Sequence, residues 1–319
     1  MMLRPARSGP SAPLVLATVV CGEQYAKEWH RNSLPSWERY AANYGYGIFA
    51  LQRSQLPADV HPGWNKFLLP ELVMEELGRP LTTLVLDADQ VFSPIAPPLE
   101  PGLRDTGYGL TILDHGPAAV DRRKVLSFLR RARVDPSFPL DSIAVARAND
   151  WGANLDLVDL GGRLPISSGF IAVPSSLASD FAVLATFARD KDAAWDGGGG
   201  DQTIASRELQ RREHYELDPR WQVIWPHVMA ERFPSLYHDA PVSRERAASA
   251  IVDSLHSAYC VHFATSWPEK DFWAVDWMDE WDRRFTSEET DELRRYLASS
   301  VEPRAYGRIA PPEIRLIAP

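Results

Sequence analysis

The feature that most constrains the fold is an apolar run that ends in two acids. Residues 81–86 are mainly leucine and valine, lack period-two alternation and lead directly into Asp87 and Asp89. Such a run, bounded by Pro80 and Pro94, predicts a strand that is buried on both faces. An α/β sheet opens its ligand crevice at the end of such a strand. Side chains alternate along extended backbone, so we expect Asp87 and Asp89 to point to the same side and to share one cation.

Composition narrows the class of protein. The chain has 319 residues, of which 45% are hydrophobic, and a net charge of −9, which argues against a chain-wide nucleic-acid surface. No apolar run reaches the ~20 residues of a membrane span. The only cysteines, Cys21 and Cys260, lie in strand-like runs, and we expect buried thiols in a reducing, cytoplasmic compartment rather than a disulfide.

Strands and helices alternate along the chain. Expected strands cover 14–21, 46–51, 81–86, 108–113, 166–173 and 258–263, and expected helices cover 23–31, 66–77, 117–138 and 177–187, with further helices starting at Ser33, at Asp201 and after the capping box Thr286-x-x-Glu289. This βαβαβ order predicts an α/β fold with a mainly parallel central sheet flanked by helices. We expect a disordered tail over 1–12, one domain over 13–285, and a C-terminal helix and tail over 286–319 that pack on it.

A basic cluster lies in the expected helix over 117–138. It includes Arg122, Arg123, Arg130, Arg131 and Arg133. The cluster is either a solvated helix face or a contact for an anionic acceptor or for lipid headgroups, which would give a peripheral membrane contact.

A metal site is the main chemical hypothesis. Asp87, Asp89 and His262 all lie at the ends of expected strands, and two carboxylates with an imidazole suit Mn²⁺ or Mg²⁺ while leaving positions open for a diphosphate. Lys270 would add a point charge for the same phosphates, with Lys66 as a second candidate. The alternatives remain open: the two acids could be turn residues, His262 an ordinary core histidine, and Asp201 only a helix N-cap.

The order of these segments resembles a known family. The likeness is carried by residues 14–20, Trp64-x-Lys66, 84–89, Ser168-Gly169-Phe170-Ile171, Asp201-Gln202, Trp221 and His262. Together they are similar to the retaining GT-A glycosyltransferases of the glycogenin and lipopolysaccharide galactosyltransferase-like group. The resemblance implies a GT-A type nucleotide-diphospho-sugar transferase fold over about residues 13–275.

The resemblance also implies roles for individual residues. It places the Asp-x-Asp pair and His262 on the metal, and Ala17, Thr18 and Tyr25 near the base and ribose of the donor. Ser168 and Gly169 belong to its donor-contacting segment, although Ser168 stands where the family usually has asparagine. Asp201 and Gln202 are implied beside the transferred sugar, as the catalytic pair.

The expected activity is therefore transfer of a hexose from a nucleotide-diphosphate sugar, with UDP-hexose implied by the resemblance, to an unknown glycan, lipid-linked or small-molecule acceptor. The sequence singles out no separate base for the acceptor, which favours net retention. Two other interpretations remain. Asp87 could be the nucleophile of a haloacid-dehalogenase-type phosphatase, or the chain could bind a nucleotide sugar without turning it over.

Overall fold

The structure is a computed structural model that describes residues 2–5, 14–99, 103–112, 166–189, 201–237, 243–264 and 272–300. Its strands are β1 (Met2–Pro5), β2 (Leu14–Val19), β3 (Gly47–Leu51), β4 (Thr82–Leu86), β5 (Gln90–Phe92), β6 (Tyr108–Ile112), β7 (Ile166–Pro174), β8 (His214–Glu216), β9 (Val223–Ile224) and β10 (Cys260–His262). Its α-helices are α1 (Glu23–Asn32), α2 (Leu34–Tyr44), α3 (Leu69–Leu77), α6 (Ala178–Ala182), α7 (Asp201–Leu209), α8 (Trp225–Arg232), α9 (Arg244–Leu255), α10 (Trp277–Arg284) and α11 (Ser287–Ser300).

The central sheet has seven strands in the order β1-β3-β2-β4-β7-β6-β8. Strands β3, β2, β4, β6 and β8 run in one direction, whereas β7 in the interior and β1 at the edge run in the other. The expected α/β fold with a mainly parallel sheet is therefore confirmed. The sequence pattern did not reveal that β7 is antiparallel to β4, because a fully buried strand has the same apolar pattern in either direction.

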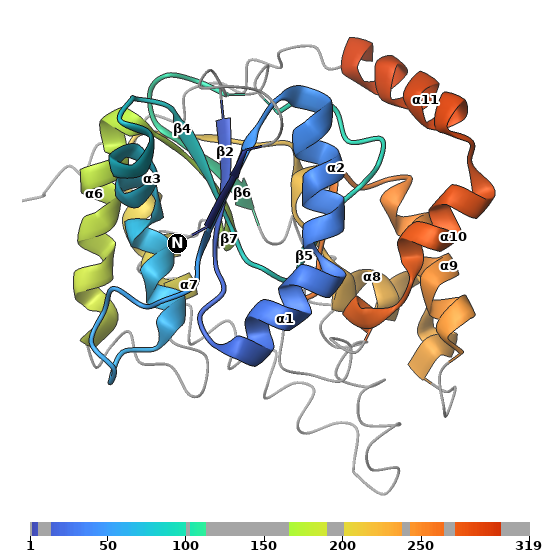
Figure 1. The fold of residues 1–319 in the computed structure, drawn as a ribbon, viewed down its shortest axis with the longest axis horizontal. Coiled ribbons are helices and arrows are strands. Elements are labelled where there is room, and N and C mark those ends of the chain that lie inside the picture. The colour runs from blue at the N-terminus through green and yellow to red at the C-terminus, as the bar shows by residue number, and fades with distance from the viewer. Residues whose placement is uncertain are drawn as a thin grey trace, which may run out of the picture.

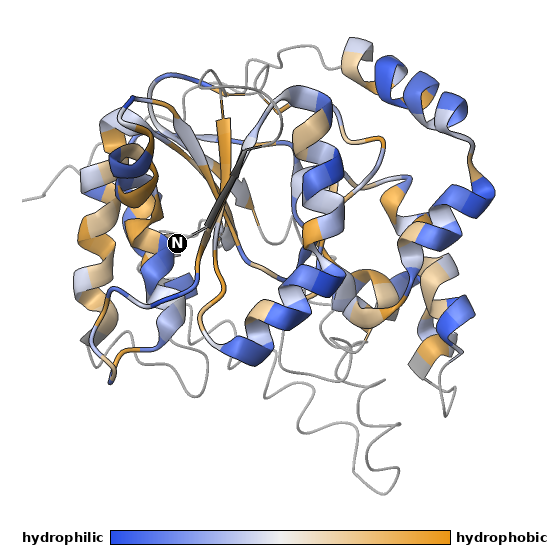
Figure 2. Cartoon of the chain, in the orientation of Figure 1, coloured by the Kyte–Doolittle hydropathy of each residue, from blue (hydrophilic) through white to orange (hydrophobic). Residues whose placement is uncertain are grey.

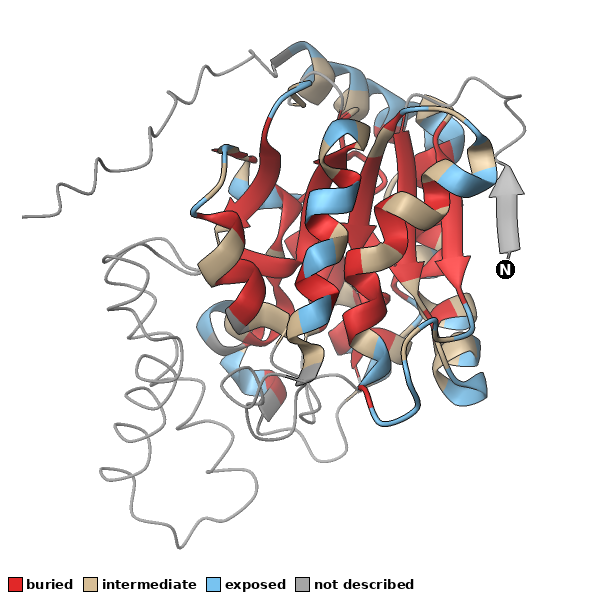
Figure 3. Cartoon of the chain, turned by 90° about the vertical axis from the view of Figure 1, so that its left-hand side faces the viewer, coloured by how far each residue is buried: buried red, intermediate tan, exposed pale blue. Residues whose placement is uncertain are grey.

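Helices cover both faces of this sheet, with α1 and α2 on one side and α3, α6 and α7 on the other (Figure 1). The strands are apolar and the outer helix faces are polar (Figure 2). Buried residues fill the layer between them (Figure 3). The two sides of the core are separate clusters, one containing Trp29 and Trp37 and the other containing Trp64, Phe67 and Phe181. Strand β4 lies between these clusters, so the expectation of a strand buried on both faces is correct.

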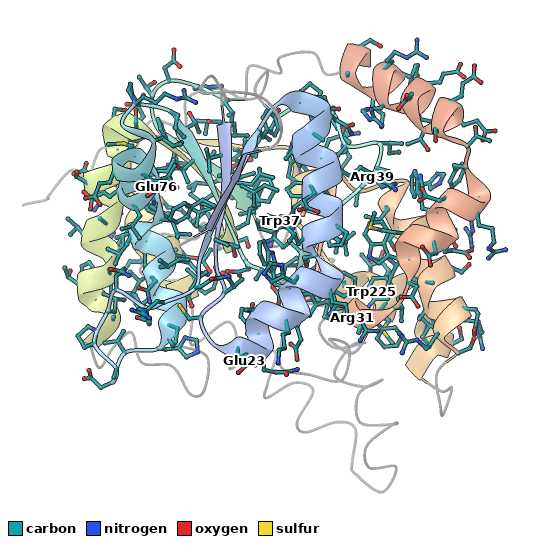
Figure 4. All side chains as sticks on the ribbon, in the orientation of Figure 1. Glu23, Arg31, Trp37, Arg39, Glu76 and Trp225 are labelled. Atoms are coloured by element: carbon teal, nitrogen blue, oxygen red, sulfur yellow. The ribbon has the colours of Figure 1, made fainter. Side chains whose placement is uncertain are left out.

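A second, three-stranded sheet in the order β5-β10-β9 packs beside the first. Its core contains Trp225, Ile251 and Trp281 from α8, α9 and α10. Helix α2 connects the two sheets, because the Nε1 of Trp37 donates to the backbone oxygen of Gln90 at 2.9 Å (Trp37 is labelled in Figure 4). Arg39 on the same helix forms a two-pronged ion pair with Asp282 on α10.

The structure of the N-terminal residues differs from the expectation, whereas the expected capping box near the other end is present. Residues 2–5, inside the expected disordered tail, form β1 and pair antiparallel with β3. The open edge of β3 offers backbone partners that a sequence pattern does not display. At the other end, the capping box is confirmed: Glu289 N–H donates to the hydroxyl of Thr286, and Thr286 N–H donates to the Glu289 carboxylate. Leu297 of α11 packs against the core.

Both cysteines are free thiols, as the sequence predicted. Cys260 is buried, whereas Cys21 is only half-buried. Among the described residues, no helix has the length and apolar character to cross a membrane.

Candidate functional site

Asp87, Asp89 and His262 converge at the end of β4. Each offers one ligand atom, and these atoms all lie within 4.8 Å of one another. The Nε2 of His262 is 3.0 Å from Asp89 Oδ1 and 3.6 Å from Asp87 Oδ2. Two carboxylates and one imidazole form a donor set that fits Mn²⁺ or Mg²⁺. The structure thus brings together the three residues that the sequence predicted as metal ligands.

The backbone that carries the two acids differs from the expectation. Strand β4 ends at Leu86, and Ala88 and Asp89 form a turn before β5 begins at Gln90. The carboxylates therefore meet because the chain turns, and the alternation of an extended strand is not the cause. His262 reaches them because β10 pairs antiparallel with β5, which places His262 opposite Gln90 in the ladder.

Gly169 on β7 forms one wall of the site. Its carbonyl accepts a hydrogen bond from Asp87 N–H at 3.1 Å, so the backbones of β4 and β7 stay in register up to the first acid. A Cβ at this position would lie 2.5 Å from Asp87 Oδ2 and 2.9 Å from His262 Cε1. Only glycine allows β7 to approach the triad this closely.

Lys66 is buried beneath the triad and joins it to a third acid. Its Nζ is 2.6 Å from Asp87 Oδ1 and 2.7 Å from Asp201 Oδ2. Burial lowers the pKa of Lys66, but the charges of Asp201 and Asp87 and their hydrogen bonds outweigh it and raise the pKa above its ordinary value. Lys66 is therefore a fixed positive charge. Three carboxylates against one ammonium leave the site with an excess of negative charge, which favours a divalent cation.

Asp201 is held in its ionised form. Burial raises its pKa, but the charge and hydrogen bond of Lys66, together with a hydrogen bond from Ser168, lower it below its ordinary value. The Ser168 hydroxyl donates to Asp201 Oδ2 at 2.9 Å. Asp201 is the first residue of α7, and its side chain links β7 to the Lys66 ion pair.

Gln202 lies between β7 and α7, and its place beside a transferred sugar stays a prediction. Its Oε1 accepts from Ser168 N–H at 2.9 Å, and its Nε2 donates to the backbone oxygen of Ile166 and to the Ser206 hydroxyl. Both ends of the amide are thus engaged by β7 and α7. In this structure Gln202 attaches α7 to β7 and supports Ser168 and Asp201.

Two further glutamines, which the sequence analysis did not single out, surround His262. The Nε2 of Gln222 lies 2.6 Å from His262 Nδ1, and Gln90 Nε2 donates to Gln222 Oε1 at 3.2 Å. Gln222 follows the short 3₁₀ helix Pro219–Trp221 and precedes β9, and no local motif marks it. The only signal available in sequence was its position beside Trp221, one of the residues that carried the family resemblance.

The residues expected near the donor lie in two different places. Tyr25 lies near the acids: burial, followed by the charges of Asp89 and Asp87, raises its pKa well above the ordinary value. Ala17, by contrast, is fully buried in the core, and Thr18 is fully buried too. Both lie in the central strand β2, and their place near the base and ribose of a donor stays a prediction. Lys270 and the segment from Arg122 to Arg133 lie outside the described residues.

Lys66 was expected at the start of an α-helix over 66–77. It lies instead in a 3₁₀ helix, Pro62–Leu68, that leads into α3. Pro62 and Pro70 explain the division, because proline favours a first turn and the α-helix starts afresh around the second one. The tighter turn of the 3₁₀ helix buries Lys66 with Trp64, Asn65 and Phe67.

No protein-family model matches the sequence, and the comparison with curated proteins gives no match. Among solved structures, the fold is similar to a glycosyltransferase involved in the glycosylation of the major capsid of PBCV-1, with 13% identity, 81% of this chain and 98% of that chain covered, and a TM-score of 0.48. It is also similar to the glycosyltransferase GlyE of Streptococcus pneumoniae TIGR4 (10% identity, 86% and 64% covered, TM-score 0.40). A third is the bifunctional glycosyltransferase WbbM (12% identity, 87% and 52% covered, TM-score 0.41).

Proposed function

We propose that this chain is a metal-dependent glycosyltransferase that moves a hexose from a nucleotide-diphosphate sugar, with UDP-hexose as the expected donor, to an acceptor with retention of configuration. The observation that carries the proposal is the convergence of Asp87, Asp89 and His262 within 4.8 Å, next to the buried Lys66–Asp201 pair. A proposed cation site joined by a lysine to one further carboxylate suits a ligand with both a phosphate part and a neutral sugar part.

Asp87, Asp89 and His262 would hold Mn²⁺ or Mg²⁺, which when bound stabilises negative charge on a departing phosphate oxygen. The remaining side chains of the site hold these ligands and the neighbouring Asp201 in place. Lys66 pairs with both Asp87 and Asp201, and its charge lowers the pKa of Asp201. Because Lys66 is already shared by two acids, its direct contribution to a donor phosphate is smaller than that of a free lysine. Lys270 stays a candidate for that role.

Retention is favoured by what the acids at the site already do. Asp87 and Asp89 belong to the proposed cation site, and Asp201 is bound by Lys66 and Ser168. None of these three is placed to take the acceptor proton as an inverting enzyme requires. Departure of the phosphate on the same face as acceptor attack needs no such base. Asp201, whose charge is fixed, would then support positive charge on the sugar, and Gln202 would hold Asp201 and Ser168 in place.

A melting-temperature screen of nucleotide sugars with and without Mn²⁺ tests the proposal first. A ligand at ~100 times its dissociation constant adds roughly 2.7 kcal/mol to stability, which gives a clear shift. Turnover is then followed by release of the nucleotide diphosphate, and the anomeric configuration of the product by NMR. A β-linked product from an α-linked donor would refute retention alone. Hydrolysis of a phosphomonoester without sugar transfer would favour the phosphatase interpretation.

Asp89→Asn provides the mutational test. The substitution preserves the shape of the side chain and removes one of the two ligand charges, so turnover and Mn²⁺ affinity should fall by orders of magnitude with little change in melting temperature. Full activity of the variant, or of the wild type in excess EDTA, would contradict the assignment of the metal site.

A further inference from the structure

Two buried glutamines connect the backbone of β7 to the imidazole of His262. Gln90 is fully buried, and Gln222 and His262 are each 5% exposed. Gln90 Nε2 donates to the carbonyl of Gly169 and to Gln222 Oε1, and Gln222 Nε2 lies within hydrogen-bond distance of Ser167 Oγ and His262 Nδ1. The chain of contacts thus runs from a backbone carbonyl to one ring nitrogen.

The Gly169 carbonyl fixes the orientation of both amides. A carbonyl can only accept, so the end of Gln90 that faces Gly169 is the NH₂ group. The second hydrogen of that NH₂ group then points to Gln222, 3.2 Å away, and requires an oxygen there. Gln222 consequently presents its own NH₂ group to Ser167 Oγ at 2.7 Å and to His262 Nδ1 at 2.6 Å.

This orientation decides which nitrogen of His262 carries the proton. Because Nδ1 receives a hydrogen bond from Gln222, it has no hydrogen of its own, and the proton of the neutral ring is on Nε2. Nε2 can then donate to Asp89 Oδ1 at 3.0 Å, which matches the observed contact. The same Nε2 is the atom that faces the two carboxylates, and as a metal ligand it must offer a lone pair instead.

We propose that Gln222, oriented by Gln90, is a positioning residue that selects the tautomer of His262, and that cation binding is coupled to rotation of the Gln222 amide. This inference rests on the proposed function in so far as the triad binds a divalent cation. After rotation, Gln222 Oε1 accepts from Nδ1–H. The lone pair of Nε2 is then available to a cation that Asp87 and Asp89 also bind. Ligating histidines commonly donate their other N–H to such an acceptor.

The surroundings allow this rotation at the loss of one hydrogen bond. The Ser167 hydroxyl, which now accepts from Gln222, can donate to Oε1 instead, because a hydroxyl does both. Only the bond from Gln90 to Gln222 is broken, since two NH₂ groups would then face each other. Gln90 therefore biases the site toward the cation-free arrangement.

The first test uses the wild-type protein without metal. In ¹⁵N-histidine-labelled protein at mildly alkaline pH, the His262 signal is identified as the one missing from His262→Gln, and its ¹⁵N shifts show which nitrogen is protonated. We expect protonated Nε2 and bare Nδ1. A proton on Nδ1 would overturn the proposal. This readout needs no cation, so it decides the tautomer even if the protein fails to bind Mn²⁺, which would contradict the proposed function instead.

The second test is Gln222→Glu, whose carboxylate still accepts from Gln90. Toward Ser167, where Gln222 now donates, it can accept from the hydroxyl instead, and at Nδ1 it can only accept. We expect the proton on Nδ1 and Mn²⁺ binding tighter by about 10- to 100-fold, the usual size of such outer-shell effects. The control is Val223→Glu, which adds the same charge at the next residue of the chain, on a half-buried side chain. Unchanged Mn²⁺ affinity of Gln222→Glu, or equal tightening by both variants, would overturn the relay.

Discussion

Gly169→Ala tests the geometry of the candidate site most directly. The added Cβ would lie 2.5 Å from Asp87 Oδ2, whereas ordinary van der Waals contact begins at 3.4 Å, so the oxygen has to move by the difference, about 0.9 Å. The same methyl group would also lie 2.9 Å from the Cε1 of His262. Asp87 cannot move freely, because Lys66 Nζ holds its other oxygen at 2.6 Å. The substitution therefore separates two of the three ligand atoms.

A displacement near 1 Å at a reacting centre lowers rates by about 10²-fold, and we expect a loss of that order in turnover together with weaker Mn²⁺ binding. Overpacking should also lower the free energy of unfolding by about 1–3 kcal/mol. Calorimetric titration with Mn²⁺, initial rates of sugar transfer and thermal melts measure the three effects separately.

Gly47→Ala is the matched control. A Cβ on Gly47 would lie 3.1 Å from Val15 Cγ2, so the variant is also crowded. This contact lies at the start of β3, at the opposite end of the sheet from the triad, and should reduce stability without changing Mn²⁺ affinity. If folded Gly169→Ala binds Mn²⁺ and transfers sugar like the wild type, β7 does not shape the site as we infer.

Three further substitutions separate the roles of neighbouring groups. Lys66→Met leaves the carboxylate of Asp201 buried without its cation, which should reduce stability by about 3 kcal/mol, the low end for a buried pair because Asp201 is 16% exposed. Since the pKa of Asp201 is lowered in the folded wild type, its stabilisation is complete above the ordinary value of 3.8 and is lost as the pH falls below it. In Lys66→Met the burial that raises this pKa, its largest influence, is opposed only by the hydrogen bonds from Ser168 and the backbone. The loss of melting temperature at acidic pH should therefore disappear or reverse in the variant, and a parallel pH profile would contradict the ion pair. Gln202→Ala removes the hydrogen bonds to Ile166 and Ser168 of β7, so we expect a loss of about 1–3 kcal/mol in thermal melts as well as slower transfer. A catalytic defect at unchanged stability would instead mean that Gln202 acts on the sugar directly. Thr286→Ala breaks the capping box and should lower stability by about 0.5–2 kcal/mol without changing Mn²⁺ affinity, whereas a change in affinity would mean that α11 acts on the site.

Local patterns predicted the elements that depend on local physics. The apolar run before Asp87 is a strand because a mainly apolar stretch is stable only when both faces are covered, and β4 is covered on both. Gly78, expected as the residue after a helix, has a left-handed φ of 65° and ends α3. The pairing of Thr286 with Glu289 spans only three residues, so it too could be read from sequence.

For the candidate site, the sequence predicted the ligand residues but not the backbone geometry that brings them together. The chemistry of carboxylate and imidazole marked Asp87, Asp89 and His262 as a possible ligand set, although Asp89 and His262 are 173 residues apart. Their spacing along the chain did not reveal the turn at Ala88 that makes the acids converge, because turn geometry there depends on the pairing of β5 with β10.

The sequence by itself determined the strands β2, β3, β4, β6, β7 and β10 and the residues that carry the charge for a cation site, but it did not reveal β1 or the 3₁₀ turn of Lys66. Only the tertiary structure decided their partners. It buried Lys66 between Asp87 and Asp201, attached Gln202 to β7, and placed Gln222 against the ring of His262. The physical reason is that hydrophobic patterning acts along the chain, whereas ion pairs and side-chain hydrogen bonds depend on distances set by how two sheets pack together.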